Sequence, residues 1–438
     1  MAYWENRSGN PNELRLLQQN GTWLAYSDAT DTNDKTLKGG HERIEEALLA
    51  ALHSTNLSVL LGSGASFAAH NQTGASAPSM GDLWDSVRAD TGEDVFDRMV
   101  EEVAGKGGKK DIENLLSLCK MRLELAAART SGAEDNEDDN EKLDDGLADF
   151  VASAEQSILK RVDFVDTDTD LKSHKEFLRR LARRSPDKPR VKLFTTNYDR
   201  CIEGAADARS IVLIDGFSHS SEQRFNRDHF QHDIVRRSPN GTRAEYVDGV
   251  FHLYKMHGSL DWRRRGDGVV IRRAATQDVL QPVLIYPRST KYQEAFTSPY
   301  LDMFSAWQSA LGEPDTTLIV AGFGFADDHI SAPIWSALES NLSLRLILCD
   351  PCFIPAVDLE PDLLDDESPR HALATNTDGL RKYQRRIVEL VRQGDSRIIV
   401  LNGRFDDFAS ALPEIIGETD RHRLEARLER VREGTSND

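Results

Sequence analysis

Asn197 and His257 are the residues of this chain whose types and surroundings are best suited to catalysis. Asn197 lies in the run Thr195-Thr-Asn-Tyr-Asp-Arg200, and His257 lies in Lys255-Met-His-Gly-Ser-Leu-Asp-Trp262. An imidazole with a pKa near neutrality can accept a proton from a hydroxyl group or from water. An amide can hold that water in position. The two residue types together favour a reaction in which a positioned water or hydroxyl group loses a proton.

The neighbours of both residues support this interpretation but leave a structural alternative open. Gly258 permits an unusual backbone angle beside the imidazole, and Ser259 and Asp261 are close enough in the sequence to fix its tautomer. Asp199 is expected to buttress the loop that carries Asn197. Asparagine and aspartate are also favoured helix caps, so capping of the following helix remains an alternative role for both.

A glycine turn near the N-terminus has the features of a phosphate-binding turn. Gly62-Ser-Gly-Ala-Ser66 follows an apolar run and opens a short helical stretch. Glycines there let the backbone approach a pyrophosphate, and a helix N-terminus offers unpaired N–H groups. The third glycine of a Rossmann fingerprint would fall at Phe67, so the match is partial. A tight turn with a purely structural role remains an alternative.

Strand-like and helix-like runs alternate along the chain and indicate the fold class. Short apolar runs, several of them β-branched, are typical of buried strands, and several are flanked by helical stretches. The runs are residues 57–61, 191–195, 211–214, 283–286, 317–321, 344–348 and 397–401. This alternation predicts an α/β fold with a doubly wound, parallel, Rossmann-like sheet. The turns that carry Asn197 and the glycines follow such runs, where ligands bind in open α/β sheets.

Three segments interrupt or extend the predicted sheet. Residues 1–40 are polar and aperiodic, and we expect an N-terminal extension that is ordered only when something docks on it. Residues from about 85 to 188 have helical spacing and predict an inserted helical subdomain, which contains an acidic loop at 131–146. Residues 418–438 predict a charged C-terminal helix that packs or makes an oligomer contact.

The overall composition limits the partners of the chain. The 54 basic and 73 acidic residues give a net charge of −19, which argues against broad binding to nucleic acid or anionic membranes. Four cysteines in 438 residues do not form a disulfide framework, and the N-terminus lacks the apolar core of a signal peptide. No run approaches the roughly 20 apolar residues that span a bilayer. We therefore expect a cytoplasmic protein.

The glycine, asparagine and histidine turns, in this order, resemble those of the sirtuin superfamily. More narrowly, they are similar to the zinc-free sirtuin-like NAD hydrolases of bacterial anti-phage defence. The resemblance covers about residues 41–417 apart from the insertion, and it implies an NAD-binding catalytic domain that cleaves NAD⁺ to nicotinamide and ADP-ribose. It implies that Asn197 orients the nicotinamide ribose and the attacking water, and that His257 is the catalytic histidine.

The resemblance also implies which residues contact NAD⁺. Ala321-Gly-Phe-Gly-Phe-Ala-Asp-Asp-His-Ile330 is similar to a Gly-Phe/Tyr-Ser-Phe-x-Asp-x-His-Ile segment of the family, with Gly324 in place of the serine. Asp327 and His329 of this segment are expected to start a helix and to pack. The expected NAD⁺-contacting residues are Gly62, Ser63, Gly64, Ala65, Ser66, Thr196, Asp199, Gly258, Gly322, Gly324 and Asn402.

No zinc or other metal is expected in this chain. Protein-deacylating sirtuins hold zinc through two Cys-x-x-Cys pairs, whereas Cys349-Asp-Pro-Cys352 is the only such pair here. A structural zinc site needs four ligands, and Cys119 and Cys201 lie far from this pair in the sequence. The chain also lacks the Gly-Ile-Pro-Asp-Phe-Arg run of those deacylases. Water is therefore the expected acceptor in place of an acyl-lysine.

The resemblance further implies defence by NAD⁺ depletion, assembly into a homo-oligomer and partnership with a HerA-like ring ATPase. Residues 1–40 and the helix at 420–433 are the candidate contact surfaces. Two other classes of function stay open at this stage. The chain could be a non-catalytic subunit that binds NAD⁺ or ADP-ribose, or it could be a protein deacylase or ADP-ribosyltransferase.

Overall fold

The computed structural model of the chain describes residues 12–27, 39–71, 76–105, 110–130, 140–237, 244–273, 281–284, 298–355, 359, 375–376 and 378–414. Three predicted segments are affected by these limits. The C-terminal helix at 418–438 lies outside the described residues, as does much of the N-terminal extension. The first part of the acidic loop at 131–146 also lies outside them, while helix α7 begins at Asn140, within the range predicted as a loop.

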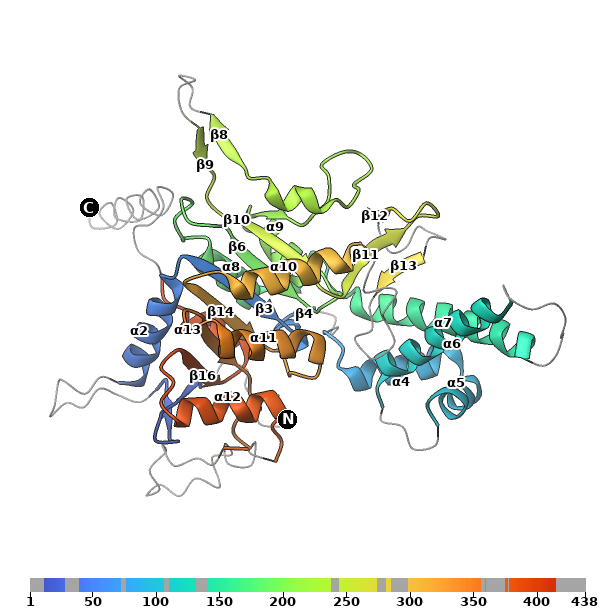
Figure 1. Ribbon diagram of the computed structural model, residues 1–438, viewed down its shortest axis with the longest axis horizontal. Coiled ribbons are helices and arrows are strands. Elements are labelled where there is room, and N and C mark those ends of the chain that lie inside the picture. The colour runs from blue at the N-terminus through green and yellow to red at the C-terminus, as the bar shows by residue number, and fades with distance from the viewer. Residues whose placement is uncertain are drawn as a thin grey trace.

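A nine-stranded sheet forms the centre of the molecule, with the strand order β2-β1-β16-β15-β14-β3-β6-β10-β7 (Figure 1). The seven strands from β16 to β7 are parallel to one another, and β1 and β2 continue the sheet antiparallel at one edge. In sheet order the strands are Trp23–Ala25, Arg15–Leu17, Ile398–Asn402, Arg345–Cys349, Thr316–Ala321, Asn56–Leu61, Val191–Thr195, Val250–Lys255 and Val212–Ile214.

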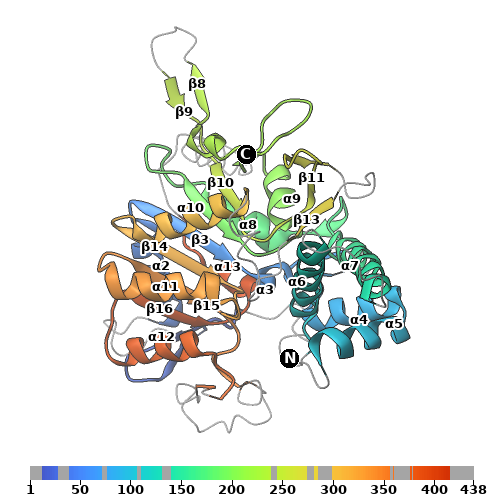
Figure 2. The same ribbon diagram turned by 45° about the vertical axis from the view of Figure 1, so that its right-hand side comes forward.

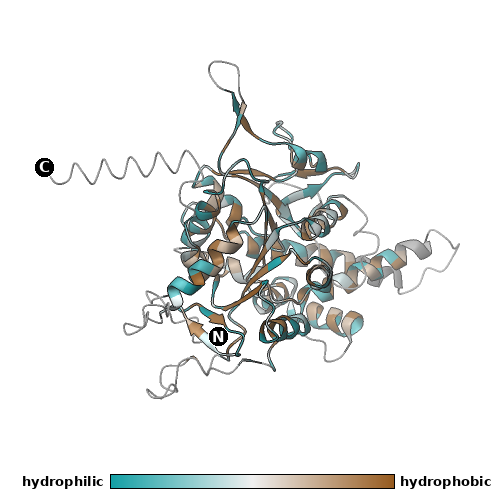
Figure 3. Ribbon diagram, turned by 60° about the vertical axis from the view of Figure 1, so that its left-hand side comes forward, coloured by the Kyte–Doolittle hydropathy of each residue, from teal (hydrophilic) through white to brown (hydrophobic). Residues whose placement is uncertain are grey.

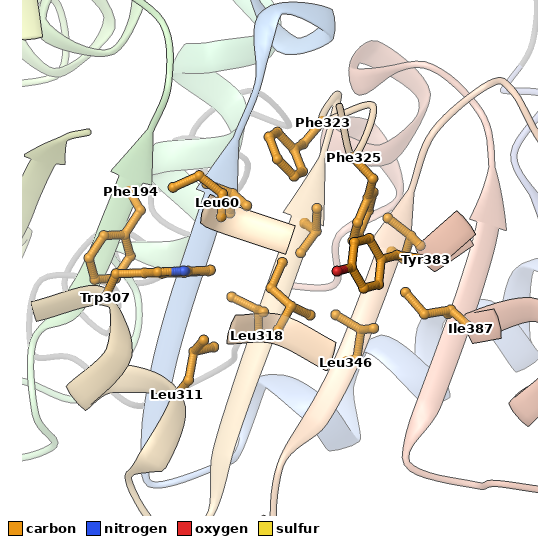
Figure 4. Close-up of a cluster of buried hydrophobic side chains, with 14 of the residues drawn as sticks. Leu60, Phe194, Trp307, Leu311, Leu318, Phe323, Phe325, Leu346, Tyr383 and Ile387 are labelled. Atoms are coloured by element: carbon orange, nitrogen blue, oxygen red, sulfur yellow. The ribbon is translucent and has the colours of Figure 1, made fainter. Parts of the chain in front are cut away.

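Helices cover both faces of the sheet, because successive strand residues point to opposite sides. In β14, Leu318 and Val320 belong to the hydrophobic core beneath α10, α11 and α12, whereas Ile319 and Ala321 belong to the core beneath α2, α8, α9 and α13. Figure 4 shows the first core at Leu318, and Figure 3 shows the hydrophobic strands between the helices. The helices are α10 (Tyr300–Gly312), α11 (Asp328–Ser340), α12 (Lys382–Arg392), α2 (Gly40–Leu52), α8 (Lys172–Leu181), α9 (Cys201–Asp207) and α13 (Phe405–Ala411). The predicted doubly wound α/β fold is confirmed.

A group of helices stands beside the sheet and has a hydrophobic core of its own (Figure 2). Aromatic contacts such as Trp84 with Phe96, at a centroid distance of 4.9 Å, lie inside this group. Its members are α4 (Met80–Thr91), α5 (Glu93–Met99), the π-helix η1 (Val100–Ala104), α6 (Ile112–Thr130) and α7 (Asn140–Val162). Helix α8 falls within the range predicted for the insertion, but its Phe177 and Leu178 pack under the sheet.

Two segments differ from the secondary structure that the sequence favoured. Within residues 12–27, β1 and β2 form a hairpin that pairs with β16, and Trp23 is fully buried, so this part of the N-terminal extension docks on the chain's own sheet. The prediction of a strand at 283–286 in the parallel sheet is wrong. Strand β13 (Gln281–Leu284) instead joins a separate antiparallel sheet with β11 (Gly258–Arg264) and β12 (Val270–Arg272).

The remaining elements are small. A hairpin of β8 (Val235–Arg237) and β9 (Ala244–Tyr246) projects from the body, as Figure 1 shows. The others are α3 (Ser63–Ser66), β4 (His70–Asn71), β5 (Thr169–Asp170) and the 3-10 helix η2 (Arg227–Gln231). Among the described helices, none is long and apolar enough to cross a membrane.

Candidate active site

A cavity of ≈ 360 Å³ opens at the carboxyl ends of the parallel strands, between the sheet and the inserted helices. Strands β3 and β14 are neighbours there, and the chain runs from β3 to one side of the sheet and returns through β14 to the other. Such a switch in strand order is where ligands bind in open α/β sheets. The lining residues are Ser63, Ser66, Ala77, Pro78, Met80, Leu83, Asp111, Glu113, Val162, Thr196, Asn197, Tyr198, Asp199, His257, Gly322, Phe323, Gly324, Ala326, Asp327 and Arg381.

The two glycine turns at the floor of the cavity pack backbone against backbone. The Gly64 amide donates to the Gly322 carbonyl at 2.9 Å, and the Gly62 amide donates to the Ala321 carbonyl at 3.1 Å. Gly322 has a φ of +62°, and a Cβ there would lie 2.3 Å from the Ala65 nitrogen. The close approach of the two loops therefore requires glycine at position 322. The amides of Gly62 and Gly64 already donate to the neighbouring loop.

Asn197 is held in a single orientation by its amide nitrogen. Its Nδ2 donates to the Gly62 carbonyl at 2.9 Å and to the Ser66 hydroxyl at 2.7 Å. Ser66 in turn donates to Asp199 Oδ2 at 2.6 Å, and Asp199 Oδ1 accepts from the Cys201 amide at 2.9 Å. Asp199 therefore buttresses the loop and accepts from the first amide of α9, whose N-cap residue is Arg200, while Asn197 does not cap this helix. With both N–H groups of Asn197 used, its Oδ1 is the atom available to accept from a ligand or water.

His257 pairs with Asp327 and not with the residues that the sequence suggested. The Nε2 of His257 lies 3.1 Å from Asp327 Oδ2, and both side chains are buried. Asp327 also starts α11 as predicted, because its Oδ1 accepts from the His329 amide at 2.8 Å. The expectation that Ser259 and Asp261 fix the imidazole is wrong, since Ser259 contacts the Tyr198 carbonyl and Asp261 pairs with an arginine of β12. The residue that fixes the imidazole is therefore Asp327, 70 residues further along the chain.

Gly258 sets the path of the backbone next to His257. Its φ of +84° belongs to the left-handed region, and a Cβ would lie 2.1 Å from the Val283 carbonyl oxygen. The small antiparallel sheet therefore approaches the histidine turn closely, because Gly258 is paired with Leu284 in β13. The unusual backbone angle predicted at this glycine is confirmed.

A buried lysine fixes the asparagine turn from beneath. Lys255, at the end of β10, is 1 % exposed, and its Nζ donates to the carbonyl oxygens of Tyr198 and Asp199. The same Nζ pairs with Glu203 Oε1 at 2.9 Å. Burial is tolerated because the charge is paired and its N–H groups are hydrogen-bonded. Strand β10, which also leads to His257, thus holds the asparagine turn in place.

The helical insertion contributes acidic residues to the cavity. Glu113, in the first turn of α6, accepts a hydrogen bond from the Tyr198 hydroxyl at 3.1 Å, and Asp111 precedes it. Burial raises the pKa of Glu113, while the nearby His257 and the Tyr198 hydrogen bond act in the opposite direction. Burial also raises the pKa of Tyr198 well above its usual value, so the phenol is the donor in this pair.

Residues 191–353 match the family model of the SIR2-like domain. The match covers less than half of the chain and supports a relationship to the sirtuin-like superfamily, which uses NAD⁺ and is a family of NAD-dependent enzymes. No curated protein matches the chain.

The SIR2-like match contains Asn197, His257 and Asp327 but neither the first glycine turn nor the helical insertion. Of the residues expected to contact NAD⁺, six line the cavity and five do not. Those that line it are Ser63, Ser66, Thr196, Asp199, Gly322 and Gly324, and the others are Gly62, Gly64, Ala65, Gly258 and Asn402. Asn402 is fully buried, and its Oδ1 accepts from the amides of Phe353 and Ile354, both at 3.1 Å. Contact of any of these residues with NAD⁺ stays a prediction.

The two cysteines of the Cys-x-x-Cys pair have neighbours within the protein. Cys349 is buried and donates to the Gly403 carbonyl at 3.4 Å, and Cys352 accepts from Gln384 Nε2 at 3.2 Å. Burial raises the pKa of both thiols, which favours the uncharged form over the thiolate that binds metals. Within the described ranges, no group of three or more His, Cys, Asp or Glu side chains is arranged to hold a metal ion.

Several lining residues were not found from the sequence. Asp327 was recognised only as a helix start, although its position after β14 places it at the ligand edge of the sheet. Glu113 and Arg381 belong to α6 and to the start of α12, which no motif connects with the asparagine and histidine turns. In the sequence, the long acidic run after residue 131 stands out in the insertion, whereas Asp111 and Glu113, which line the cavity, belong to no recognisable motif.

Proposed function

We propose that this protein is an NAD⁺ glycohydrolase that cleaves NAD⁺ to nicotinamide and ADP-ribose. The observation that carries the proposal is the cavity at the strand ends, in which an orientation-locked Asn197 faces the same space as the His257–Asp327 pair. The SIR2-like match over both residues supports NAD⁺ as the substrate. The cavity volume of ≈ 360 Å³ falls in the range of small-molecule sites.

The charges around the cavity suit the two ends of NAD⁺. Asp111, Glu113, Asp199 and Asp327 give the lining an acidic character, which favours the cationic pyridinium and the positive charge that develops on the ribose. Arg381 is the only lysine or arginine among the described residues that line the cavity, and it is suited to the pyrophosphate. The amides of Gly62 and Gly64 do not take this role, because they donate to the neighbouring loop.

The proposed reaction breaks the bond between the nicotinamide nitrogen and C1′ of the ribose. The electron pair of that bond stays on the nitrogen, so nicotinamide leaves as a neutral molecule without a general acid. Water adds to C1′ and loses one proton. Asn197 Oδ1 is placed to accept from the ribose or from the water, and His257 is placed to accept a proton from a ribose hydroxyl group or from the water.

Nicotinamide release from NAD⁺ by the purified protein tests this proposal. We expect wild type to release nicotinamide and ADP-ribose in at least one assembly state, and Asn197→Ala and His257→Ala to be slower by about 100-fold or more. Exposed His219→Ala serves as a matched control that keeps wild-type activity. Equal, slow release by wild type and His257→Ala in every assembly state would overturn the proposal. A stable and unconsumed NAD⁺ complex in calorimetry would instead identify a binding subunit, and transfer of label from NAD⁺ to protein would identify an ADP-ribosyltransferase.

We further propose that the activity depletes cellular NAD⁺ during phage infection and that a homo-oligomer works with a HerA-like ring ATPase in the cytoplasm. This proposal follows from the resemblance of the turns alone. Co-expression with a HerA-like ATPase encoded beside the gene, followed by size-exclusion chromatography and measurement of NAD⁺ after infection, tests it. Separate elution of the two proteins, with NAD⁺ unchanged in infected cells, would contradict it.

A further inference from the structure

Glu113 brings a carboxylate from the helical insertion into the cavity that contains Asn197 and His257. One of its oxygens, Oε1, accepts from the Tyr198 hydroxyl at 3.1 Å, which fixes the direction of the carboxylate. In the part of the chain that the structure describes, no hydrogen bond or ion pair occupies the other oxygen, Oε2. Glu113 thus presents an oriented carboxylate with one free acceptor atom.

The carboxylates of Asp327 and Asp199, which also line the cavity, make hydrogen bonds within the fold. Asp327 uses one oxygen for His257 and the other for the His329 amide. Asp199 uses one oxygen for Ser66 and the other for the Cys201 amide. Each oxygen of these two carboxylates therefore already has a partner within the fold, whereas Oε2 of Glu113 has none among the described residues.

The groups around Glu113 shift its pKa in both directions. Desolvation raises its pKa, and Asp111, just before α6, and Asp327 at the start of α11 act in the same direction. His257 and the Tyr198 hydrogen bond act in the opposite direction. A carboxylate whose pKa is raised is a stronger base than an exposed one, because proton transfer to it is less unfavourable.

We propose that Glu113 is a further catalytic residue, the general base that takes the proton of the attacking water. This inference rests on the proposed hydrolysis of NAD⁺. As the water oxygen bonds to C1′, the bond from C1′ to the nicotinamide nitrogen breaks and its electron pair leaves with nicotinamide. One water proton passes to Oε2 of Glu113 and then to solvent. His257, held by Asp327, is then left to act on the ribose hydroxyl groups.

The first test compares Glu113→Gln with wild type and with Glu124→Gln, a matched control on the exposed side of the same helix. We expect Glu113→Gln to lower kcat for nicotinamide release by about 100-fold while NAD⁺ binding, measured by calorimetry, changes less than threefold. Glu124→Gln is expected to match wild type. A kcat for Glu113→Gln within twofold of wild type would overturn the inference. Equal melting temperatures of the variants show that the fold is retained.

The second test follows kcat/KM against pH. A general base must be deprotonated, so wild-type activity should fall as the pH drops through the pKa of Glu113. Tyr198→Phe removes a hydrogen bond that lowers this pKa and should move the acidic limb to higher pH, while Glu113→Gln should abolish the limb. An acidic limb that stays in place in both variants would contradict a base role, whatever the effect on kcat.

The third test supplies a nucleophile that needs no base. Azide is already anionic, so it should restore nicotinamide release by Glu113→Ala and give the azido derivative of ADP-ribose, with no comparable gain for wild type. Failure of azide to restore an otherwise folded and NAD⁺-binding Glu113→Ala would overturn the inference. Absence of nicotinamide release by wild type in every assembly state would instead overturn the proposed function, and the inference with it. The two failures are therefore distinguishable.

Discussion

The two walls of the cavity are held in place by different means. The wall formed by the sheet loops is tied together through the backbone, as the hydrogen bond from the Gly64 amide to the Gly322 carbonyl shows. The wall formed by the insertion belongs to a helical group with its own hydrophobic core, and the Tyr198–Glu113 hydrogen bond is a contact between the two walls. Strand register therefore positions the first wall, and helix packing positions the second.

The two walls also contribute different residues to the cavity. The sheet loops carry Asn197 and His257, which follow directly on the paired strands β6 and β10. The insertion contributes the carboxylates of Asp111 and Glu113 and the apolar side chain of Val162 to the lining. Variants that affect one wall at a time can test this division.

The largest expected effect comes from Gly322→Ala, which disrupts the backbone packing of the Gly322 loop on the turn at 62–66 in the sheet wall. The added Cβ would lie 2.3 Å from the Ala65 nitrogen at a positive φ of +62°. We expect the free energy of unfolding to fall by about 3 kcal/mol, measured by chemical denaturation. Gly324→Ala is the matched control, because nothing lies within 4 Å of a Cβ at that position. Equal stability of the two variants would show that the sheet wall is not rigid.

Asp327→Asn tests whether the sheet wall fixes His257. Asparagine still caps α11, so the helix should keep its start, but the charged partner of the imidazole is lost. We expect kcat for nicotinamide release to fall by about 10- to 100-fold with little change in melting temperature. If kcat is unchanged, the contact between Asp327 and His257 does not matter for the reaction.

His174 lies in α8, which packs under the sheet, and it should make the stability of the protein depend on pH. Burial lowers its pKa from 6.5 to about 4, so between these pH values the unfolded chain binds a proton that the folded protein does not. The free energy of unfolding should therefore fall by about 2 kcal/mol as the pH drops from 6.5 to 5. His174→Gln should lose this part of the pH dependence, whereas exposed His219→Gln should keep it. Identical pH dependence in His174→Gln and wild type would contradict a neutral buried histidine.

The smallest expected effect comes from Ser66→Ala, which loosens Asn197 without removing it. The substitution deletes the acceptor of one Asn197 N–H and a donor to Asp199. We expect a loss of about 1 kcal/mol in the free energy of unfolding and a fall of about fivefold in kcat. Ser58→Ala is the matched control, because the Ser58 hydroxyl is also buried but has no partner among the described residues. A larger loss in Ser58→Ala than in Ser66→Ala would argue against the Asn197 contact.

Local pattern predicted much of the sheet. The runs at 57–61, 191–195 and 317–321 coincide with β3, β6 and β14 to within one residue, because buried parallel strands are continuous apolar runs. The run at 283–286 has the same character but pairs antiparallel in a small sheet, since strand partners are chosen by tertiary contacts. The hairpin of β1 and β2 was missed because its short strands lie among polar residues.

The sequence by itself determined the α/β architecture and the turns that carry Asn197 and His257. Apolar periodicity and turn formation depend on residues that are close together in the sequence. The sequence also predicted the unusual backbone angle at Gly258, whereas the need for glycine at Gly322 came from the packing of one loop on the other. Only the tertiary structure decided which residues meet across the cavity. The pairing of His257 with Asp327 and the approach of Glu113 to Tyr198 join parts of the chain that are 70 and 85 residues apart. Contacts at such separations depend on strand order and helix packing, which no local pattern specifies.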